Sequence, residues 1–373
     1  MTLSVEVEAT HGPARATTIT TARGTVTTPC FMPVGTRGVV RAVETEDLEA
    51  LGAQIVLGNT YHLLFRPGPE VVEGLGGIHG FSDWGGHVLT DSGGYQVFSL
   101  SPRVDDDGVT FRSTYDGDEY RLTPEGAVDV QVRLGADIQM VLDECAPLPS
   151  PPELIRRAVE RTADWAQRAR RAFLERELPA RNQFGIVQGG VDAALRTESA
   201  QRTVAIGFDG YAVGGLSVGE SRDQMLPALE AAIAELPADA PRYLMGVGDP
   251  VGIVESIALG VDLFDCVLPT RFGRHGTLLT SEGRLNLKNN RFATDPGPLD
   301  PHCDCRVCQR YSRAYLRHLF NVHEPTGPRL TTLHNLAWTL RLTRRARQAV
   351  LDGTLDALRA EVAGVYESGE GRN

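Results

Sequence analysis

Lysine is almost missing from this chain: Lys288 is the only lysine among 373 residues. Schiff-base catalysis and the Walker phosphate-binding loop each need a lysine at a defined position, so neither is expected. No stretch approaches the roughly 18 consecutive apolar residues of a membrane span. The start, MTLSVEVEAT, also lacks a basic stretch followed by an apolar one. These absences predict a soluble, cytoplasmic protein without a membrane anchor.

Positive charge is also in short supply. The chain has 37 Lys and Arg against 48 Asp and Glu, a formal net charge of -11, which argues against bulk binding of a polyanion. The basic residues concentrate late in the chain, where Arg271 and Arg274 come just after Asp265. A local patch for a polyanionic substrate is therefore expected. Further basic residues of this region are Lys288, Arg291, Arg306, Arg310, Arg313, Arg317, Arg341, Arg344 and Arg345.

Short apolar runs alternate with helix-like stretches along most of the chain, which is typical of a parallel sheet. The runs lie at residues 55–57, 88–89, 140–142, 186–187, 212–213, 244–245 and 263–264, and an eighth is expected at 285–288. This pattern predicts an α/β protein with a (β/α)8 TIM barrel, and a doubly wound open sheet is the alternative. An antiparallel β region is expected over residues 3–34, and a hairpin at Asp116-Gly117.

Polar residues follow several of these runs directly. In a parallel barrel the strand ends meet at one face, so Asp91, Asp143, Gln188 and Asp265 would share a pocket. Two carboxylates across a pocket suit glycosidic chemistry: one attacks the anomeric carbon and the other moves a proton on the leaving group. Asp143 and Gln188 can hydrogen-bond a purine edge. Taken singly, the motif at Asp91 is better explained as a helix cap, and Asp265 is explained equally well as one half of a structural ion pair.

Three cysteines, Cys303, Cys305 and Cys308, crowd into one hexapeptide that is too short for a disulfide framework. With His334, which follows an expected helix cap at Thr331-Thr332, they form a complete tetrahedral set for a structural zinc ion. A reduced cluster without metal is the alternative. We expect one catalytic domain over residues 1–373, with a zinc-binding lobe inserted at 297–350. Other candidates for the fourth ligand are His302, His318 and His323.

Two further motifs point elsewhere. The stretch from Gly215 to Gly219 matches the G-x-S-x-G elbow of serine hydrolases, with Ser217 as nucleophile, but no oxyanion-loop motif accompanies it. The stretch at residues 246–252 is similar to a dinucleotide fingerprint with Val251 in place of the third glycine, so a phosphate cradle is the most that it indicates. A non-catalytic RNA-binding module is a third possibility.

Taken together, these motifs resemble the bacterial tRNA-guanine transglycosylase (queuine tRNA-ribosyltransferase) family over nearly the whole chain. The matching stretches are DSGGYQ at Asp91, DEC at Asp143, FGIVQGG around Gln188, GGLSVGE at Gly215, FDCVLPTR at Asp265 and the cysteine cluster. The resemblance implies a barrel with a zinc lobe and one structural Zn2+ per subunit. It also implies a homodimer and exchange of the wobble guanine of tRNA for 7-aminomethyl-7-deazaguanine.

The resemblance also implies roles for single residues. Asp265 would be the nucleophile of a covalent ribosyl intermediate, and Asp91 the general acid and base. Cys145 and Val218 would suit the aminomethyl base. The substrate-binding set would be Asp91, Ser92, Gly93, Gly94, Tyr95, Asp143, Gln188, Gly215, Leu216 and Met245, with Tyr95 and Met245 stacking on the base. The RNA-binding set would be Gly246, Val247, Gly248, Asp249, Pro250, Val251, Gly252, Thr270, Arg271, Phe272, Gly273 and Arg274.

Overall fold

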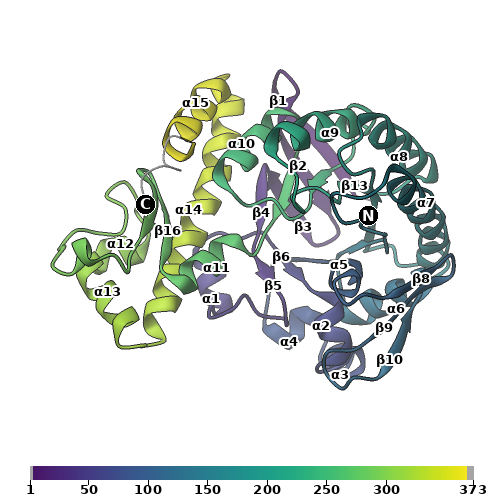
Figure 1. The fold of residues 1–373 in the computed structure, drawn as a ribbon, viewed down its shortest axis with the longest axis horizontal. Coiled ribbons are helices and arrows are strands. Elements are labelled where there is room, and N and C mark those ends of the chain that lie inside the picture. Colours follow the sequence, from purple (N-terminus) through teal and green to yellow (C-terminus); the bar gives the residue numbers. More distant parts are fainter. Residues whose placement is uncertain (1–2, 368–373) are drawn as a thin grey trace.

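The computed structural model describes residues 3–367, and its centre is a barrel of parallel strands surrounded by helices (Figure 1). The strand order is β4-β15-β14-β13-β12-β11-β7-β6-β5. β4 pairs with β15 and β5 with β6, so the ring closes through these two short strands and the predicted (β/α)8 barrel is confirmed. The strands are β4 (Cys30–Met32), β5 (Val34–Gly35), β6 (Ile55–Gly58), β7 (His87–Thr90), β11 (Ile138–Met140), β12 (Asn182–Val187), β13 (Gly210–Val213), β14 (Arg242–Leu244) and β15 (Leu263–Asp265).

The eighth strand of the barrel lies at the start of the chain, so the prediction at residues 285–288 was wrong. β4 and β5 are two parts of one strand that is interrupted at Pro33, which has no N–H to donate. The Pro33 carbonyl still accepts from Leu57 N at 3.0 Å, which keeps the ladder continuous. The predicted antiparallel region is confirmed only up to residue 28. Its strands are β1 (Ser4–His11), β2 (Ala14–Thr21) and β3 (Gly24–Thr28).

Capping residues and glycines set where the helices that cover the barrel begin and end. Thr123 caps α6 by accepting a hydrogen bond from Gly126 N at 3.1 Å, and Gly135 ends that helix at a φ of 80°. In α7, Ala158, Trp165 and Ala169 are buried along one face. The barrel helices are α1 (Thr45–Ala50), α2 (Thr60–Phe65), α3 (Pro69–Gly74), α4 (Gly77–Ser82), α5 (Gly94–Phe98), α6 (Pro124–Leu134), α7 (Pro152–Leu174), α8 (Ala193–Ile206), α9 (Arg222–Ala234), α10 (Pro250–Ala258) and α11 (Leu268–His275).

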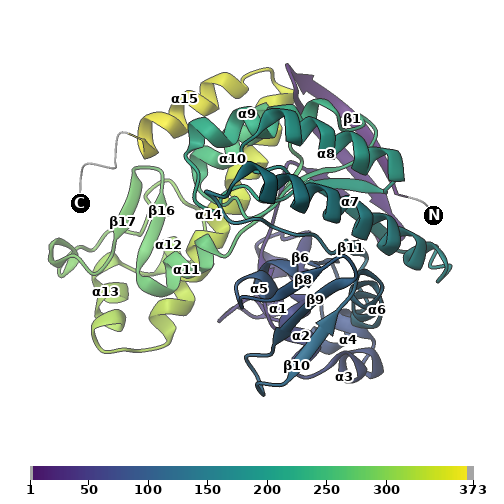
Figure 2. The same ribbon diagram turned by 45° about the vertical axis from the view of Figure 1, so that its right-hand side comes forward.

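A small three-stranded sheet is inserted after α5, on the side of the barrel that carries α2 and α3 (Figure 2). β9 (Gly108–Arg112) and β10 (Glu119–Leu122) form the predicted hairpin around Asp116-Gly117, and β8 (Arg103–Asp105) adds a third strand. Phe65 of α2 lies edge-on to Phe111 and Tyr120, so aromatic contacts fix this sheet to the barrel.

A buried ion pair joins the antiparallel region to the barrel. The Arg15 guanidinium donates to both carboxylate oxygens of Asp262, at 2.9 Å and 2.5 Å, and both side chains are buried. Asp262 immediately precedes β15, whose opposite end is Asp265. A paired buried charge of this kind fixes the start of the strand, because each partner would be costly to bury alone.

The last part of the chain forms a lobe beside the barrel, at the left of Figures 1 and 2. It contains the antiparallel pair β16 (Thr277–Thr280) and β17 (Gly283–Asn286), then α12 (Arg306–Arg310), α13 (Arg313–Asn321) and the start of α14 (Thr326–Leu351). α15 (Leu355–Tyr366) ends the described chain. Asp47 of α1 ties the lobe to the barrel, since it accepts hydrogen bonds from Arg306 at 2.6 Å and Arg329 at 2.7 Å.

Candidate active site and metal centre

The chain turns that follow the barrel strands bring the predicted polar residues together. Asp91 follows β7, Gln188 follows β12, and Asp265 is the last residue of β15. Gln188 Nε2 donates to Asp143 Oδ2 at 2.6 Å, and the charges of Asp265 and Asp143 both raise the pKa of Asp91. Asp91 and Asp265 are each only partly buried, so both are accessible from solvent. The structure therefore places the two carboxylates at one open mouth of the barrel.

Asp91 is held by three donors from its surroundings. Asn59 Nδ2 donates to Asp91 Oδ2 at 2.7 Å, and Oδ1 accepts from Thr60 N at 2.8 Å and Gly93 N at 3.1 Å. Burial, reinforced by Asp265 and Asp143, nevertheless raises the pKa of Asp91 to about 7. A carboxyl with that pKa can both give and take a proton near neutrality, as a general acid and base must.

The two carboxylate oxygens of Asp265 differ in their hydrogen bonds. Tyr243 Oη donates to Asp265 Oδ1 at 2.5 Å, and Gly246 N donates to the same oxygen at 2.9 Å. Among residues 3–367 no hydrogen bond reaches Oδ2. Burial raises the pKa of Asp265, while the two hydrogen bonds oppose that rise by stabilising the ionised form. The arrangement orients a carboxylate with one oxygen available to a bound molecule.

Glycines let the backbone approach Asp143 and Gln188 closely. A Cβ on Gly215, which has a φ of 66°, would lie 2.2 Å from Gln188 Oε1, and a Cβ on Gly94 would lie 3.3 Å from Asp143 Oδ1. Burial raises the pKa of Asp143 to about 6, and the hydrogen bond from Gln188 counters this rise. An amide and a carboxyl therefore stand side by side in the wall, a pair that can bind the edge of a purine.

The other predicted substrate-binding residues surround this group. Tyr95 at the start of α5 is 64% exposed, which leaves its ring free to stack. Met245 is partly buried, and its Sδ would lie 3.5 Å from a Cβ on Gly214. Ser92 and Leu216 are buried in the wall. Tyr95 thus offers an exposed ring directly after Gly94, and Met245 offers a thioether directly after β14.

The predicted RNA-binding residues divide into exposed and buried ones. In the stretch 246–252, Gly246 is exposed and Asp249 caps α10, accepting from Gly252 N at 2.9 Å. The buried members of this stretch are Val247, Gly248, Pro250, Val251 and Gly252. On α11, Arg271 is exposed, Phe272 and Arg274 are partly buried, and Thr270 and Gly273 are buried. RNA contact at the buried positions stays a prediction.

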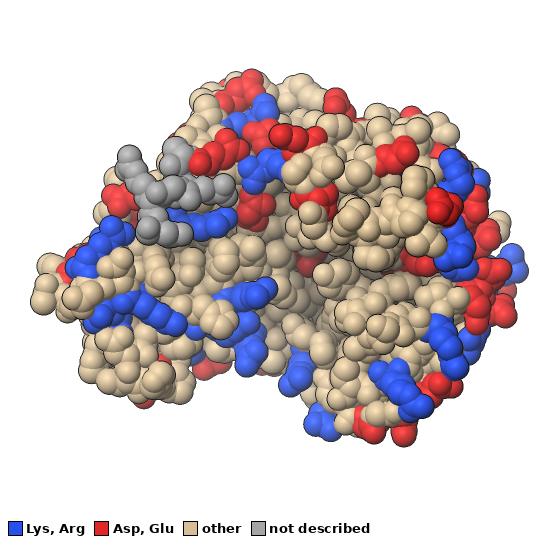
Figure 3. All heavy atoms as spheres, in the orientation of Figure 1, with Lys and Arg blue, Asp and Glu red and all other residues tan. Residues whose placement is uncertain are grey.

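A cavity of about 490 Å³ lies against Val267 and Thr270, shortly after Asp265 in the chain, and has a basic wall. Arg37, Arg41 and Arg274 line it, together with His62 and Val267. Burial and the charge of Arg37 lower the pKa of His62. Figure 3 shows basic side chains running from the lobe toward the hollow at the centre of the molecule, whereas acidic and basic ones are mixed along the top and right edges. The cavity is therefore suited to an anion.

Sequence reasoning missed several residues of this site. Asn59 directly follows an apolar strand, as Asp91 does, and this position after a strand would have been enough to identify it. Tyr243 lies inside β14, two residues before Met245 and on the same strand face, but a buried tyrosine alone does not indicate a function. Arg37 and Arg41 are more than 200 positions from Arg274 in the sequence, and only the closed barrel brings them together.

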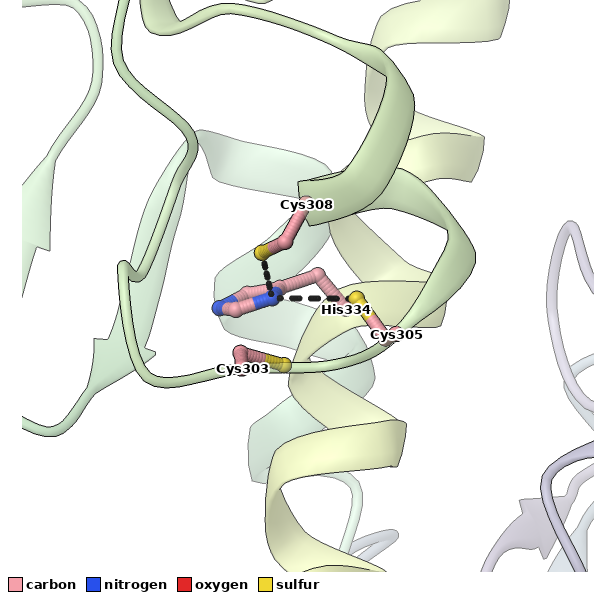
Figure 4. Close-up of side chains that lie close together, drawn as sticks. All are labelled: Cys303, Cys305, Cys308 and His334. Carbon is pink, nitrogen blue, oxygen red and sulfur yellow. Dashed lines mark hydrogen bonds between the residues drawn. The ribbon is translucent and has the colours of Figure 1, made fainter.

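The three cysteines and His334 form one cluster, as Figure 4 shows. Their ligand atoms lie within 4.8 Å of one another, and His334 Nδ1 is 3.6 Å from Cys305 Sγ and 3.3 Å from Cys308 Sγ. Tetrahedral zinc would separate a nitrogen and a sulfur ligand by about 3.6 Å. His334 Nε2 donates to Leu279 O at 2.9 Å, which leaves the Nδ1 lone pair free for a metal. The donor set therefore fits a closed metal site.

The surroundings of His334 differ from the prediction in one respect. Thr331 and Thr332 are not a helix cap, because α14 begins at Thr326 and both hydroxyls bond to carbonyls in the preceding turn. His334 is fully buried, whereas His302, His318 and His323 are exposed. The structure thus selects His334 as the fourth ligand residue.

Comparison with known proteins identifies the family. The model of the family described as "Queuine tRNA-ribosyltransferase" matches residues 10–368. A queuine tRNA-ribosyltransferase of Gluconacetobacter diazotrophicus is 52% identical over 360 residues, which cover 95% of this chain and 92% of that protein. The one of Koribacter versatilis is 51% identical over 95% of each chain, and one of Thermus thermophilus is 51% identical over 93% of this chain and 90% of its own. In residues 3–367, no helix is both long and apolar enough to cross a membrane. The chain belongs to the queuine tRNA-ribosyltransferase family.

Proposed function

We propose that this protein is a tRNA-guanine transglycosylase that replaces the wobble guanine of tRNA by 7-aminomethyl-7-deazaguanine, a step of queuosine biosynthesis. The observation that carries the proposal is the pair of accessible carboxyls, Asp91 and Asp265, beside a wall built from Asp143 and Gln188. Such an enzyme must flip its target nucleotide out of the RNA before reacting with it. The basic cavity lined by Arg274 offers a place for the flanking phosphates.

The exchange proceeds by two displacements at C1′ of the wobble ribose. In the first, Asp265 Oδ2 bonds to C1′ while the bond from C1′ to N9 breaks, and its electron pair leaves with guanine, which receives the proton of Asp91. In the second, the Asp91 carboxylate takes the N9 proton of the incoming base. That nitrogen then bonds to C1′, and the bond to Asp265 breaks. Two inversions retain the configuration of the ribose.

The test of this function is the uptake of labelled guanine into tRNA. The wild-type protein is expected to incorporate guanine. We expect 7-aminomethyl-7-deazaguanine to compete better than queuine, because Cys145 and Val218 resemble the residues of bacterial members of the family that accept the aminomethyl base. Binding of tRNA without incorporation would instead support an RNA-binding module. A serine hydrolase is not favoured, because no histidine in the described part of the chain hydrogen-bonds to Ser217.

The rate of adduct formation is expected to depend on pH with an upper limb near the pKa of Asp91. Because that pKa is raised to about 7, Asp91 keeps its proton up to neutrality and loses it above. The rate in the first displacement should therefore fall by about tenfold per pH unit above about pH 7, and fall again at low pH as Asp265 becomes protonated. Single-turnover trapping of the RNA adduct measures the profile, with circular dichroism as a control for unfolding. A rate that stays constant up to about pH 9 would remove Asp91 from the role of acid.

We also propose that the metal is one structural Zn2+ per subunit, that the lobe at 297–350 is a subdomain of a single catalytic domain, and that the protein works in the cytoplasm. The donor set of three thiolates and one imidazole supports zinc, because softer N and S ligands select it over magnesium or calcium. With four protein ligands no position remains for water, so the ion would order the lobe and take no part in the exchange.

A homodimer through the lobe is the last part of the proposal. Tyr311 and Tyr315 stack there with ring centroids 5.5 Å apart, and Tyr315 is 44% exposed. Exposed aromatic pairs are typical of interface centres. Light scattering should give twice the chain mass of 40.4 kDa for the wild type and a shift toward one chain for Tyr315→Ala. Leu174→Ala, at an exposed position on α7, serves as the control. A Tyr315→Ala variant that keeps the wild-type mass would place the interface elsewhere.

A further inference from the structure

Helix α8 carries a fully buried arginine, Arg196, next to the loops that follow β12 and β13. Its Nε donates to Gly190 O at 2.8 Å, and Nη1 donates to Val187 O at 3.0 Å and Gly214 O at 2.7 Å. Nη2 donates to Gly215 O at 3.2 Å. One guanidinium therefore joins the backbones of two neighbouring strand ends.

The charge of Arg196 has no carboxylate partner. Within residues 3–367 no ion pair involves it, whereas the other deeply buried arginine, Arg15, is paired with Asp262. Burial lowers the pKa of Arg196 to about 10, so it stays protonated at neutral pH. Burying a charge without an ion-pair partner destabilises a fold, and here the carbonyl dipoles, together with the charge of Glu220, offset part of that cost. Stability alone does not explain an arginine at this position.

The anchored carbonyls belong to the residues that flank the predicted base-binding groups. Val187 and Gly190 enclose Gln188, whose own N–H donates to Ser199 Oγ of α8 at 3.0 Å. Gly214 and Gly215 precede Leu216. Helix α8 thus supports both loops from behind through two side chains, Arg196 and Ser199.

The anchoring also fixes two donors. In a trans peptide the C=O and the next N–H point in opposite directions. Because the carbonyls of Gly214 and Gly215 point to Arg196, the N–H groups of Gly215 and Leu216 point away from it. Neither N–H has a hydrogen-bond partner in the described part of the chain. Two free, oriented donors beside Gln188 match the carbonyl oxygen and adjacent edge of a guanine-type base.

We propose that Arg196 is a positioning residue for base recognition, which holds the N–H groups of Gly215 and Leu216 and the side chain of Gln188 in the geometry that binds a guanine-type base. The proposal rests on the function proposed above, from which it takes the base. It assigns no contact between Arg196 and substrate.

The test compares base binding with tRNA binding in Arg196→Lys, which keeps the charge but loses the forked set of donors. Calorimetry with free guanine, without tRNA, should give a Kd raised by about tenfold or more, since at least two hydrogen bonds to the loops are lost. The KM for guanine should rise equally, while the KM for tRNA should change by less than about twofold. A merely structural role would weaken both substrates together.

Two further variants keep the test decisive. Arg202 lies on the same helix and pairs with Glu198 at the surface, so the Arg202→Lys protein should bind guanine as the wild type does. Ser199→Ala removes the bond to Gln188 N without touching a charge, so it tests the α8 support even if Arg196→Lys does not fold. Its Kd for guanine is expected to rise by about two- to fivefold.

The outcomes separate the two proposals. The positioning role is overturned if Arg196→Lys binds guanine as the wild type does. If that variant does not fold, unchanged guanine binding in Ser199→Ala overturns it instead. An equal loss of guanine and tRNA binding also overturns it. A wild-type protein that binds guanine but does not exchange it into tRNA overturns the proposed function while the role of Arg196 is still decided by binding. A wild-type protein that binds no guanine overturns both.

Discussion

Replacing Asp265 by asparagine is expected to abolish the covalent RNA adduct and to lower the exchange rate by on the order of 10⁴- to 10⁶-fold, the loss seen when a nucleophile is removed. This substitution should leave the other hydrogen bonds of the side chain unchanged. Oδ1 of an asparagine can still accept from Tyr243 Oη and Gly246 N, so only the free oxygen, Oδ2, is replaced by an amide. The neutral side chain also escapes the burial that raises the pKa of Asp265, so the variant should be at least as stable as the wild type at neutral pH.

The measurement is a denaturing gel of protein incubated with tRNA in the absence of free base. Tyr243→Phe is the matched control, because it removes one hydrogen bond from Oδ1 and leaves Oδ2 in place. It should form the adduct more slowly, by about tenfold, but to the same final yield. An Asp265→Asn adduct at wild-type yield would transfer the nucleophile to another carboxylate, and Asp143→Asn would be the next variant to examine.

The sequence predicted the strand ends of the site because a closed barrel obeys a simple rule: polar residues after buried parallel strands meet at one face. Asp91, Gln188 and Asp265 needed no more than that. The first strand of the barrel escaped detection because Pro33 divides it into two short pieces, each below the length at which periodicity is informative. The apolar run at 285–288 was assigned instead, although it belongs to the hairpin of β16 and β17.

Other residues could not be predicted because their roles depend on partners far away in the sequence. Arg196 resembles any arginine on an amphipathic helix until the loops after β12 and β13 close over it. Tyr243 acquires its role only through Asp265, 22 positions later. Arg37 and Arg274 line the same cavity only because β4 pairs with β15 and so closes the barrel. Tertiary contacts of this kind are invisible to local patterns.

Loss of the metal is expected to weaken tRNA binding far more than base binding. Helix α14, which carries the proposed ligand His334, packs against α11. Asn335 Nδ2 donates to Pro269 O at 3.0 Å, and Thr331 Oγ1 donates to Gly273 O at 2.7 Å. Helix α11 carries Arg274, which lines the basic cavity. The base wall, by contrast, is supported by α8 on another side of the barrel. Disorder of the lobe should therefore reach the proposed RNA contacts and spare the proposed base-binding wall.

Cys308→Ser tests this directly. Structural zinc contributes roughly 10 kcal/mol or more of apparent binding free energy to small zinc-binding domains, so removing one thiolate should release the ion and leave the lobe susceptible to protease. Elemental analysis should show about one zinc per chain in the wild type and in Cys30→Ser, a buried cysteine outside the cluster, and much less in Cys308→Ser. The Kd for tRNA should rise by on the order of 100-fold, while calorimetry should show guanine binding within about twofold of the wild type. A Cys308→Ser protein that keeps stoichiometric zinc would contradict the proposed ligand set. A protein that loses base and tRNA binding alike would contradict the claim that the lobe supports tRNA binding but not base binding.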